Sequence, residues 1–315
     1  MHPALSVIFF TTTAGAGYGL LMMLGVLAPI GILPPDRVFG AVALALALAL
    51  VSTGLFASLF HLSHPERSWR AMLQYRSSWL SREGVAASVT YLPALVFILG
   101  WVGVGNTSGT WGLMGVAASF MALVTVLCTA MIYQSLKTIH EWHNSLTLPN
   151  YLMLALMSGG VWLSALVHLF GIQAPTVDAY VIAYTAIAWG LKVAYWNHID
   201  TTRHPSTRRT ATGIRARGAV RLVDPPHMTD NFLLKEMGFR IARKHALKLR
   251  RITHVTAFAV PLVGLVVALV LQGPVAAGGA VVAALSASFG VVLERWLFFA
   301  EARHTVMLYY GEGPA

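Results

Sequence analysis

The sequence predicts an all-α integral membrane protein with eight transmembrane helices and a long basic cytoplasmic loop between helices six and seven. Hydrophobic residues make up 57% of the 315 residues and charged residues only 11%, whereas a soluble protein carries about 25% charged residues. The apolar runs are apolar all round, which is typical of helices in contact with lipid. We therefore interpret residues 1–315 as a single polytopic membrane domain.

Apolar runs of about 20 residues are long enough to cross a bilayer as helices. Eight runs meet this length: 6–30, 38–60, 84–104, 111–134, 149–171, 177–197, 254–272 and 275–298. Three of their connections are long: 61–83, 135–148 and 198–253. In the first run, Gly15, Gly17 and Gly19 favour close helix–helix packing, because no strand precedes them to form a dinucleotide-binding motif.

Basic residues predict the orientation of the chain. Nineteen of the 22 lysines and arginines fall in the three long connections and the C-terminal tail, and thirteen of these lie in the basic insert 198–253. The opposite side has only Arg37. Because Lys and Arg are retained on the cytoplasmic side, both termini and all three long connections are predicted to be cytoplasmic. The expected location is the inner membrane of a bacterium.

Histidines are the most informative polar residues. There are twelve, and most lie at or beyond the predicted cytoplasmic helix ends, with His168 on the other side. Their uneven distribution indicates a redox or proton-handling site near the cytoplasmic face. The single cysteine, Cys128, excludes an iron–sulfur cluster ligated by this chain alone.

The densest polar group follows the second span and leads into the third. It contains His61, His64, Arg67, Trp69, Arg70, Arg82 and Glu83. One interpretation of Glu83 is a helix N-terminal anion that the helix dipole favours. The other is a proton acceptor at the membrane surface beside a histidine.

Two motifs in this region, together with the end of the last span, resemble a known family. They are His61-Leu62-x-x-Pro65-x-Arg67, then Ser81-x-Glu83, and finally the stretch from Glu294 to Thr305. The chain resembles the anchor subunits of the dimethyl sulfoxide reductase family (DmsC-like), and the resemblance covers most of the spans. With its motif loop predicted to be cytoplasmic, it is most similar in character to the anchors of sulfite-oxidising molybdoenzymes of the SoeABC type.

The resemblance implies a function. Such anchors hold a molybdopterin catalytic subunit and an iron–sulfur subunit on the membrane, and they exchange electrons with quinone, either ubiquinone or menaquinone. They carry no molybdenum themselves. The histidine and the glutamate that the family associates with the quinone correspond to His61 and Glu83 here. The expected reaction is sulfite oxidation with quinone reduction, with a quinol-oxidising anchor as the alternative direction.

The predicted site lies at the cytoplasmic ends of helices two and three, where an apolar quinone can enter from lipid and exchange protons with water. Its residues are His61 and Glu83, with Arg82, Lys192 and His198 as further candidates. A separate surface is predicted to dock the iron–sulfur subunit: His64, Arg67, Trp69 and Arg70. Arginine and tryptophan are favoured in such interfaces.

Other functions stay open at this stage. A haem b cytochrome would use two histidines as axial ligands, such as His61 with His140, His143 or His198. A transporter is disfavoured because the charges gather at one face and the spans look continuous. The segment 231–252 is basic with interspersed apolar residues, which predicts contact with anionic lipid, and no nucleic-acid-binding motif is present.

Overall fold

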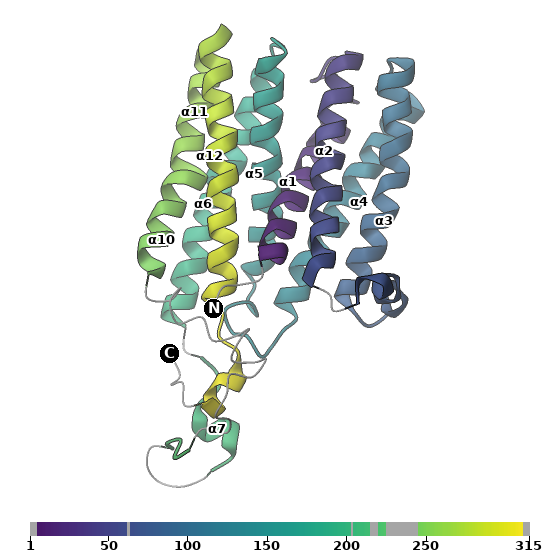
Figure 1. Cartoon of the computed structure of the whole chain (residues 1–315). Helices are drawn as coiled ribbons and strands as arrows, with labels where there is room; N and C mark the ends of the chain where they lie inside the picture. Colours follow the sequence, from purple (N-terminus) through teal and green to yellow (C-terminus); the bar gives the residue numbers. More distant parts are fainter. Residues whose placement is uncertain (1–4, 62–63, 203, 215–219, 225–244, 311–315) are drawn as a thin grey trace.

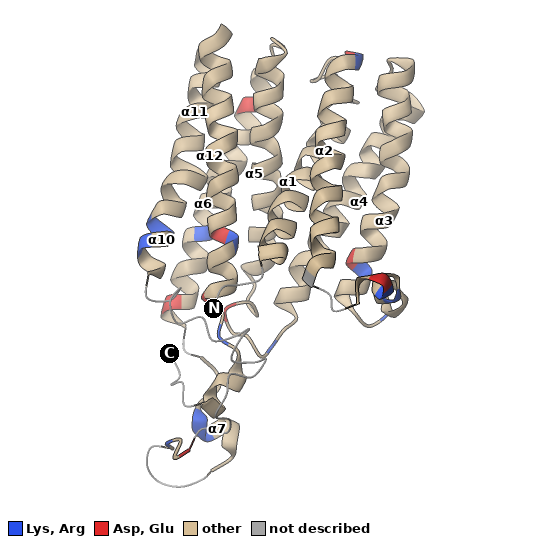
Figure 2. Cartoon of the chain, viewed as in Figure 1, with Lys and Arg blue, Asp and Glu red and all other residues tan. Residues whose placement is uncertain are grey.

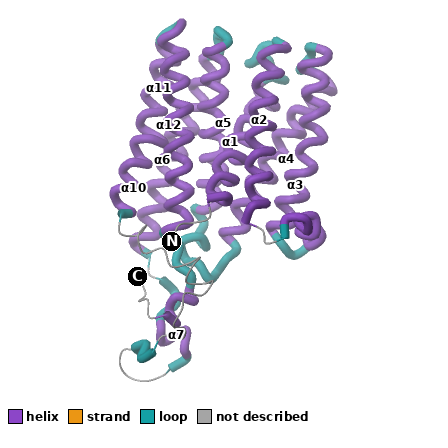
Figure 3. Tube along the Cα trace, in the orientation of Figure 1, coloured by secondary structure: helices purple, strands orange, loops and turns teal. Residues whose placement is uncertain are grey.

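The computed structural model describes residues 5–61, 64–202, 204–214, 220–224 and 245–310. In this part of the chain, eight helices are long and apolar enough to cross a membrane, and no strand is present. The prediction of an all-α protein with eight spans is therefore confirmed. The helices stand side by side as one bundle (Figures 1 and 3).

The first four spans form one half of the bundle. They are α1 (Leu5–Leu27), α2 (Arg37–Ser58), α3 (Trp79–Ile98) and α4 (Gly109–Gln134). A π-helical turn, Leu99–Val104, extends α3. Within this half, α1 packs against α2 and α4, and α3 packs against α4.

The last four spans form the other half. They are α5 (Thr147–Leu169), α6 (Pro175–Thr201), the span Ala246–Val270 and α12 (Gly273–Ala300). The third of these consists of α10 (Ala246–Thr253), a π-helical turn (His254–Ala259) and α11 (Val260–Val270). The two halves meet mainly where α1 packs against α5, and less extensively where α4 packs against α5 and α1 against α12.

The predicted glycine packing occurs at this junction. A Cβ atom on Gly19 would lie 1.8 Å from the carbonyl oxygen of Ala155 on α5. Gly17 faces α2 in the same way, with Ala47 O 2.7 Å from its Cβ position. Gly15 has nothing within 4 Å of its Cβ position, so only two of the three glycines mark close helix contacts.

The ends of the bundle differ. The N-terminal end of α1 and the C-terminal end of α12 lie at one end (Figure 1), together with the described parts of the three long connections and residues 301–310. We call this the loop end, and Figure 2 shows that charged residues gather there. The opposite end has short connections only. An even number of spans, as predicted, accounts for this arrangement.

Three boundaries differ clearly from the sequence expectation. The third span begins at Trp79 instead of 84. The seventh span begins at Ala246 instead of 254, because α10 is a charged turn that continues into the apolar part without a break. The sixth span continues to Thr201. The basic insert between helices is therefore 202–245 instead of 198–253. Of the predicted lipid-contacting segment 231–252, residues 231–244 lie outside the described residues, and the rest belongs largely to α10.

Candidate functional site

Glu83 lies early in α3 and is buried against α4. The hydroxyl of Thr129 on α4 donates a hydrogen bond to its carboxylate Oε1, and Glu83 is only 4% exposed. The N-cap of α3 is Ser78, whose hydroxyl accepts a hydrogen bond from the backbone N of Ser81 at 3.4 Å. Because Glu83 lies beyond the first turn of α3, the helix dipole does not account for it. The geometry is that of a buried carboxylate held toward a second helix.

Arg82, the neighbour of Glu83, points elsewhere. Its guanidinium donates to the carbonyl oxygens of Tyr75 at 2.9 Å and Arg76 at 2.7 Å, and it stacks 4.3 Å from the centre of the Trp79 ring. These contacts order the connection that leads into α3. The Arg82 guanidinium is therefore directed at this connection and not at the Glu83 carboxylate.

The predicted docking residues lie on a short 3-10 helix, Pro65–Gln74, beside α3 at the loop end (Figure 1). No residue of this helix is buried. The ring of Trp69 is exposed, with the Arg70 guanidinium 5.5 Å from its centre. His64 Nδ1 lies 3.0 Å from Glu66 Oε1, and Arg67 Nε lies 3.7 Å from the same oxygen. His61 ends the preceding helical turn, and its side chain lies outside the described ones.

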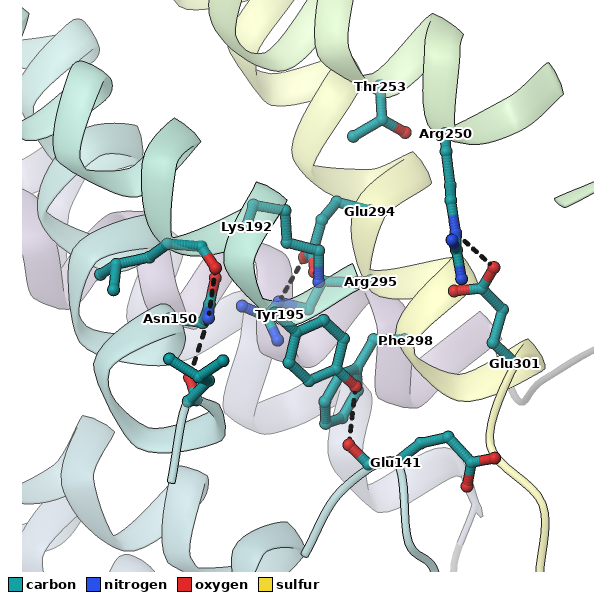
Figure 4. Close-up of polar contacts among 12 residues, drawn as sticks. Glu141, Asn150, Lys192, Tyr195, Arg250, Thr253, Glu294, Arg295, Phe298 and Glu301 are labelled. Atoms are coloured by element: carbon teal, nitrogen blue, oxygen red, sulfur yellow. Dashed lines mark hydrogen bonds and ion pairs between the residues drawn. The ribbon is translucent and has the colours of Figure 1, made fainter. Parts of the chain in front are cut away.

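Lys192 is separate from Glu83 and belongs to a buried charged cluster, which consists of Lys192, Glu294 and Arg295. Lys192 on α6 donates to Glu294 Oε1 on α12, and Arg295 Nε lies 3.2 Å from Glu294 Oε2 (Figure 4). All three side chains are at most 3% exposed. Burying charges between membrane helices is costly, so such residues usually mark a functional site.

Aromatic rings surround the charged cluster. Lys192 Nζ lies 4.1 Å from the centre of the Tyr195 ring, and the Arg295 guanidinium lies 3.8 Å from the centre of the Tyr151 ring. A ring face attracts a cation, and the attraction is stronger in a dry site. The rings therefore stabilise two cations that share a single carboxylate.

A small cavity with several polar groups in its wall lies where the two halves of the bundle meet. It measures about 20 Å³ and is lined from α1, α4, α5 and α12, with Tyr18, Thr129, Tyr151 and Arg295 among its lining residues. The hydroxyls of Tyr18 and Tyr151 are buried and have no hydrogen-bond partner among the described residues. Such a cavity has room for about one water molecule, and several polar groups are available to bind it.

The cleft at the loop end is larger and more polar. Two adjoining pockets of about 220 and 200 Å³ share Glu141, Ile199, Asp200 and Arg303. Arg250, which lines the first pocket, pairs with Glu301 at 2.8 Å and with Asp200 at 2.6 Å. Burial raises the pKa of Glu301, and the Arg250 guanidinium opposes this effect.

Three histidines gather beside the second pocket. The rings of His198 and His204 lie 6.2 and 5.5 Å from the ring of His140, centre to centre. Burial lowers the pKa of His140, Glu141 opposes this, and the two neighbouring rings reinforce it. The structure thus places His198 next to His140 at the edge of the loop-end cleft instead of beside Glu83. Among the described residues, no group of three or more His, Cys, Asp or Glu side chains is arranged to hold a metal ion.

The sequence interpretation did not single out Glu294 and Arg295 as site residues. They lie in an apolar span, and the rule that intramembrane charges are functional would have identified them. The same rule identifies Asp178 near the opposite end of the bundle. Its carboxylate accepts hydrogen bonds from Ser164 at 2.5 Å and from His168 at 2.9 Å, and these bonds join α5 to α6.

Two comparisons with known proteins place the chain in a family. The family described as DMSO reductase anchor subunit (DmsC) matches residues 1–300. The chain is also 34% identical over 330 residues to the C subunit of sulfite dehydrogenase from Allochromatium vinosum, covering 98% of this chain and 99% of that protein. The chain belongs to the DMSO reductase anchor subunit family. It is a multi-pass membrane anchor subunit of a complex of the DMSO-reductase type.

Proposed function

We propose that this anchor exchanges electrons between an iron–sulfur cluster of its partner subunit and the membrane quinone pool, in the direction of sulfite oxidation with quinone reduction. The family supports a quinone-linked role, and the name of the relative, a sulfite dehydrogenase, supports the substrate of the catalytic partner. The single cysteine, Cys128, is buried and free. An iron–sulfur cluster must therefore come from another subunit.

The buried Glu83 carboxylate carries this proposal. A quinone reduced by two electrons must also take up two protons, so a titratable group has to stand beside its oxygens. Glu83 is such a group near the loop end of the bundle, and Thr129 orients its carboxylate. We assign proton transfer to Glu83 and a hydrogen bond to the quinone head group to His61.

Docking of the iron–sulfur subunit is assigned to the exposed helix Pro65–Gln74. Trp69, Arg67 and Arg70 are all exposed there, and exposed tryptophan and arginine are the residues that contribute most to protein interfaces. This helix is anchored to α3 because the Ser81 hydroxyl donates to the carbonyl oxygen of Ala71. A protein bound there would lie close to Glu83, as electron transfer to a nearby quinone requires. The molybdopterin subunit is proposed to bind to the iron–sulfur subunit, on the side that faces away from the anchor.

The quinone site is tested by Glu83→Gln and His61→Ala in the complete complex. The complex should assemble, and dye-linked oxidation by the catalytic partner should continue. Quinone-linked turnover should fall by about 10- to 100-fold or more, the range expected for loss of a positioned proton-transfer group. Asp36→Asn is the matched control. It changes another carboxyl to an amide, at the opposite end, where Asn can still cap α2. Quinone turnover at the control level in both variants would refute the site.

The docking surface is tested by reversing two charges, with Arg67→Glu and Arg70→Glu together. The iron–sulfur subunit should then move to the soluble fraction, while the anchor stays in the membrane. Lys137→Glu is the control, because Lys137 is also exposed at the loop end but lies outside the proposed surface. Equal retention of the partner by both proteins would exclude the helix Pro65–Gln74 as the docking site.

A further inference from the structure

The buried charged cluster has no role in the proposed quinone site as described so far. Two cations, Lys192 and Arg295, share one anion, Glu294, between α6 and α12. The cluster therefore carries one surplus positive charge. A purely structural ion pair would need one partner of each sign. Glu301, which also attracts Lys192, is paired with Arg250 at 2.8 Å, so the cluster has no second carboxylate of its own.

One side of the cluster reaches the cavity next to Glu83. Arg295 lines this cavity together with Thr129, and Thr129 donates its hydroxyl hydrogen bond to Glu83. Tyr18 and Tyr151, whose hydroxyls have no hydrogen-bond partner among the described residues, line the same cavity. A single water bound here would connect the Glu83 side of the bundle with the charged cluster.

The other side of the cluster reaches the cleft at the loop end. Lys192 Nζ and the Arg250 guanidinium both lie near the Trp196 ring, at 4.9 and 5.4 Å from its centre. Arg250 lines the cleft and pairs there with Glu301. Tyr195, which contacts Lys192, donates its hydroxyl to the carbonyl oxygen of Glu141, another residue of the cleft (Figure 4).

We propose that Lys192 and Glu294 relay protons between this cleft and the cavity beside Glu83, with Arg295 as a fixed counter-charge. The proposal rests on the proposed function. For each proton that Glu83 gives to a reduced quinone oxygen, water in the cavity returns one to Glu83. That proton comes from Lys192, which passes it to the Glu294 carboxylate, and Glu294 passes it on to the cavity water. The cleft then reprotonates Lys192. Two such cycles accompany the two electrons from the partner's cluster.

The surplus charge fits this sequence of steps. Arginine keeps its proton in proteins, so Arg295 stays positive throughout, whereas a buried lysine can release its proton. When Glu83 has given up its proton, its carboxylate balances the surplus cation of the cluster. Glu83 and the cluster together are then neutral until Glu83 takes up its next proton.

The test uses two substitutions of Lys192 in the complete complex. Lys192→Met removes the exchangeable proton and leaves Glu294 and Arg295 as a balanced pair. Lys192→Arg keeps the charge but not the ability to release a proton. If Lys192 relays protons, both variants should lower quinone-linked turnover about tenfold or more. They should also raise the solvent deuterium isotope effect on this turnover. Dye-linked activity and assembly should persist, and Asp36→Asn again serves as the control.

Several outcomes would overturn the relay. If Lys192→Arg restores the full quinone rate that Lys192→Met loses, the cluster is only a structural ion pair. If both variants keep the normal rate and isotope effect while Glu83→Gln is slow, the relay is wrong and the quinone site stands. Slow Lys192 variants beside a normal Glu83→Gln rate would refute the Glu83 assignment and, with it, the last step of the relay.

Discussion

The contact between α1 and α5 provides a sharp test of the bundle. A Cβ atom on Gly19 would lie 1.8 Å from the carbonyl oxygen of Ala155, and one on Gly159 would lie 2.0 Å from the backbone N of Leu20. The overlap is with backbone on both sides, so no side chain can turn away to relieve it. Gly15, one turn earlier on α1, has no atom within 4 Å of its Cβ position.

The magnitude follows from comparing two identical substitutions. Replacing Gly by Ala inside a helix favours the helix by about 0.5–1 kcal/mol, and this gain is the same for Gly15→Ala and Gly19→Ala. Only Gly19→Ala must also push two helices apart, and overpacking of this kind costs about 1–3 kcal/mol, occasionally more. The difference in stability between the two variants should therefore be about 1–3 kcal/mol or more, with Gly19→Ala the less stable.

Thermal unfolding of the purified anchor in a fixed detergent measures this difference. Gly15→Ala should unfold at or slightly above the temperature of the unmodified protein, and Gly19→Ala several degrees lower. Equal midpoints for the two variants would show that α1 and α5 do not approach as closely as described. The pairing of the two halves of the bundle would then have to be revised.

Three further predictions concern other parts of the chain. Asp178→Asn should lower the unfolding temperature by several degrees without changing quinone-linked turnover, since its bonds to Ser164 and His168 join α5 to α6; an unchanged midpoint would contradict this role. Burial lowers the pKa of His304, whose neutral ring accepts a hydrogen bond from the backbone N of Val306 at 3.0 Å. The neutral His304 ring should therefore stabilise the folded protein at pH values above the unfolded-state pKa of about 6.5. This stabilisation should be lost as the pH falls through the pKa of His304 in the folded protein, which is lower. His304→Asn, which keeps an acceptor, should therefore lose less stability between pH 8 and pH 5 than the unmodified protein, and an equal loss would exclude His304 as the cause. Reporter fusions after residues 35, 107 and 174 should be active in the periplasm, and cytoplasmic activity would reverse the predicted orientation.

Hydropathy predicted every span because lipid contact requires long apolar runs. It located helix ends less well where charged residues belong to a helix. Arg250 and its basic neighbours in α10 look like loop residues in a hydropathy profile, yet α10 continues directly into the seventh span. Similarly, α3 begins at Trp79, before the predicted start at 84, because Ser78 caps the helix ahead of Arg82 and Glu83.

The site was only partly predictable for a related reason. Position along an apolar span gives the approximate depth of a residue in the membrane, but it does not tell which neighbouring helix the residue faces. Lys192 and Glu83 were grouped by depth, whereas Lys192 faces Glu294 on α12 and Glu83 faces Thr129 on α4. The bond from Lys192 on α6 to Glu294 on α12 joins residues that are 102 positions apart in the sequence. A spacing argument does not contain that information.

The packing of the bundle and the proposed proton route depend on the same junction. Glu83 belongs to the first half of the bundle, the charged cluster belongs to the second, and the cavity between them is lined by α1, α4, α5 and α12. The close contact at Gly19 holds α1 against α5, which are two of the four helices that line this cavity. A substitution that pushes these helices apart should slow quinone-linked turnover without altering a titratable group. Variants of Lys192 and Glu83 can therefore be interpreted as proton-transfer defects only when their unfolding temperature shows that this junction is intact.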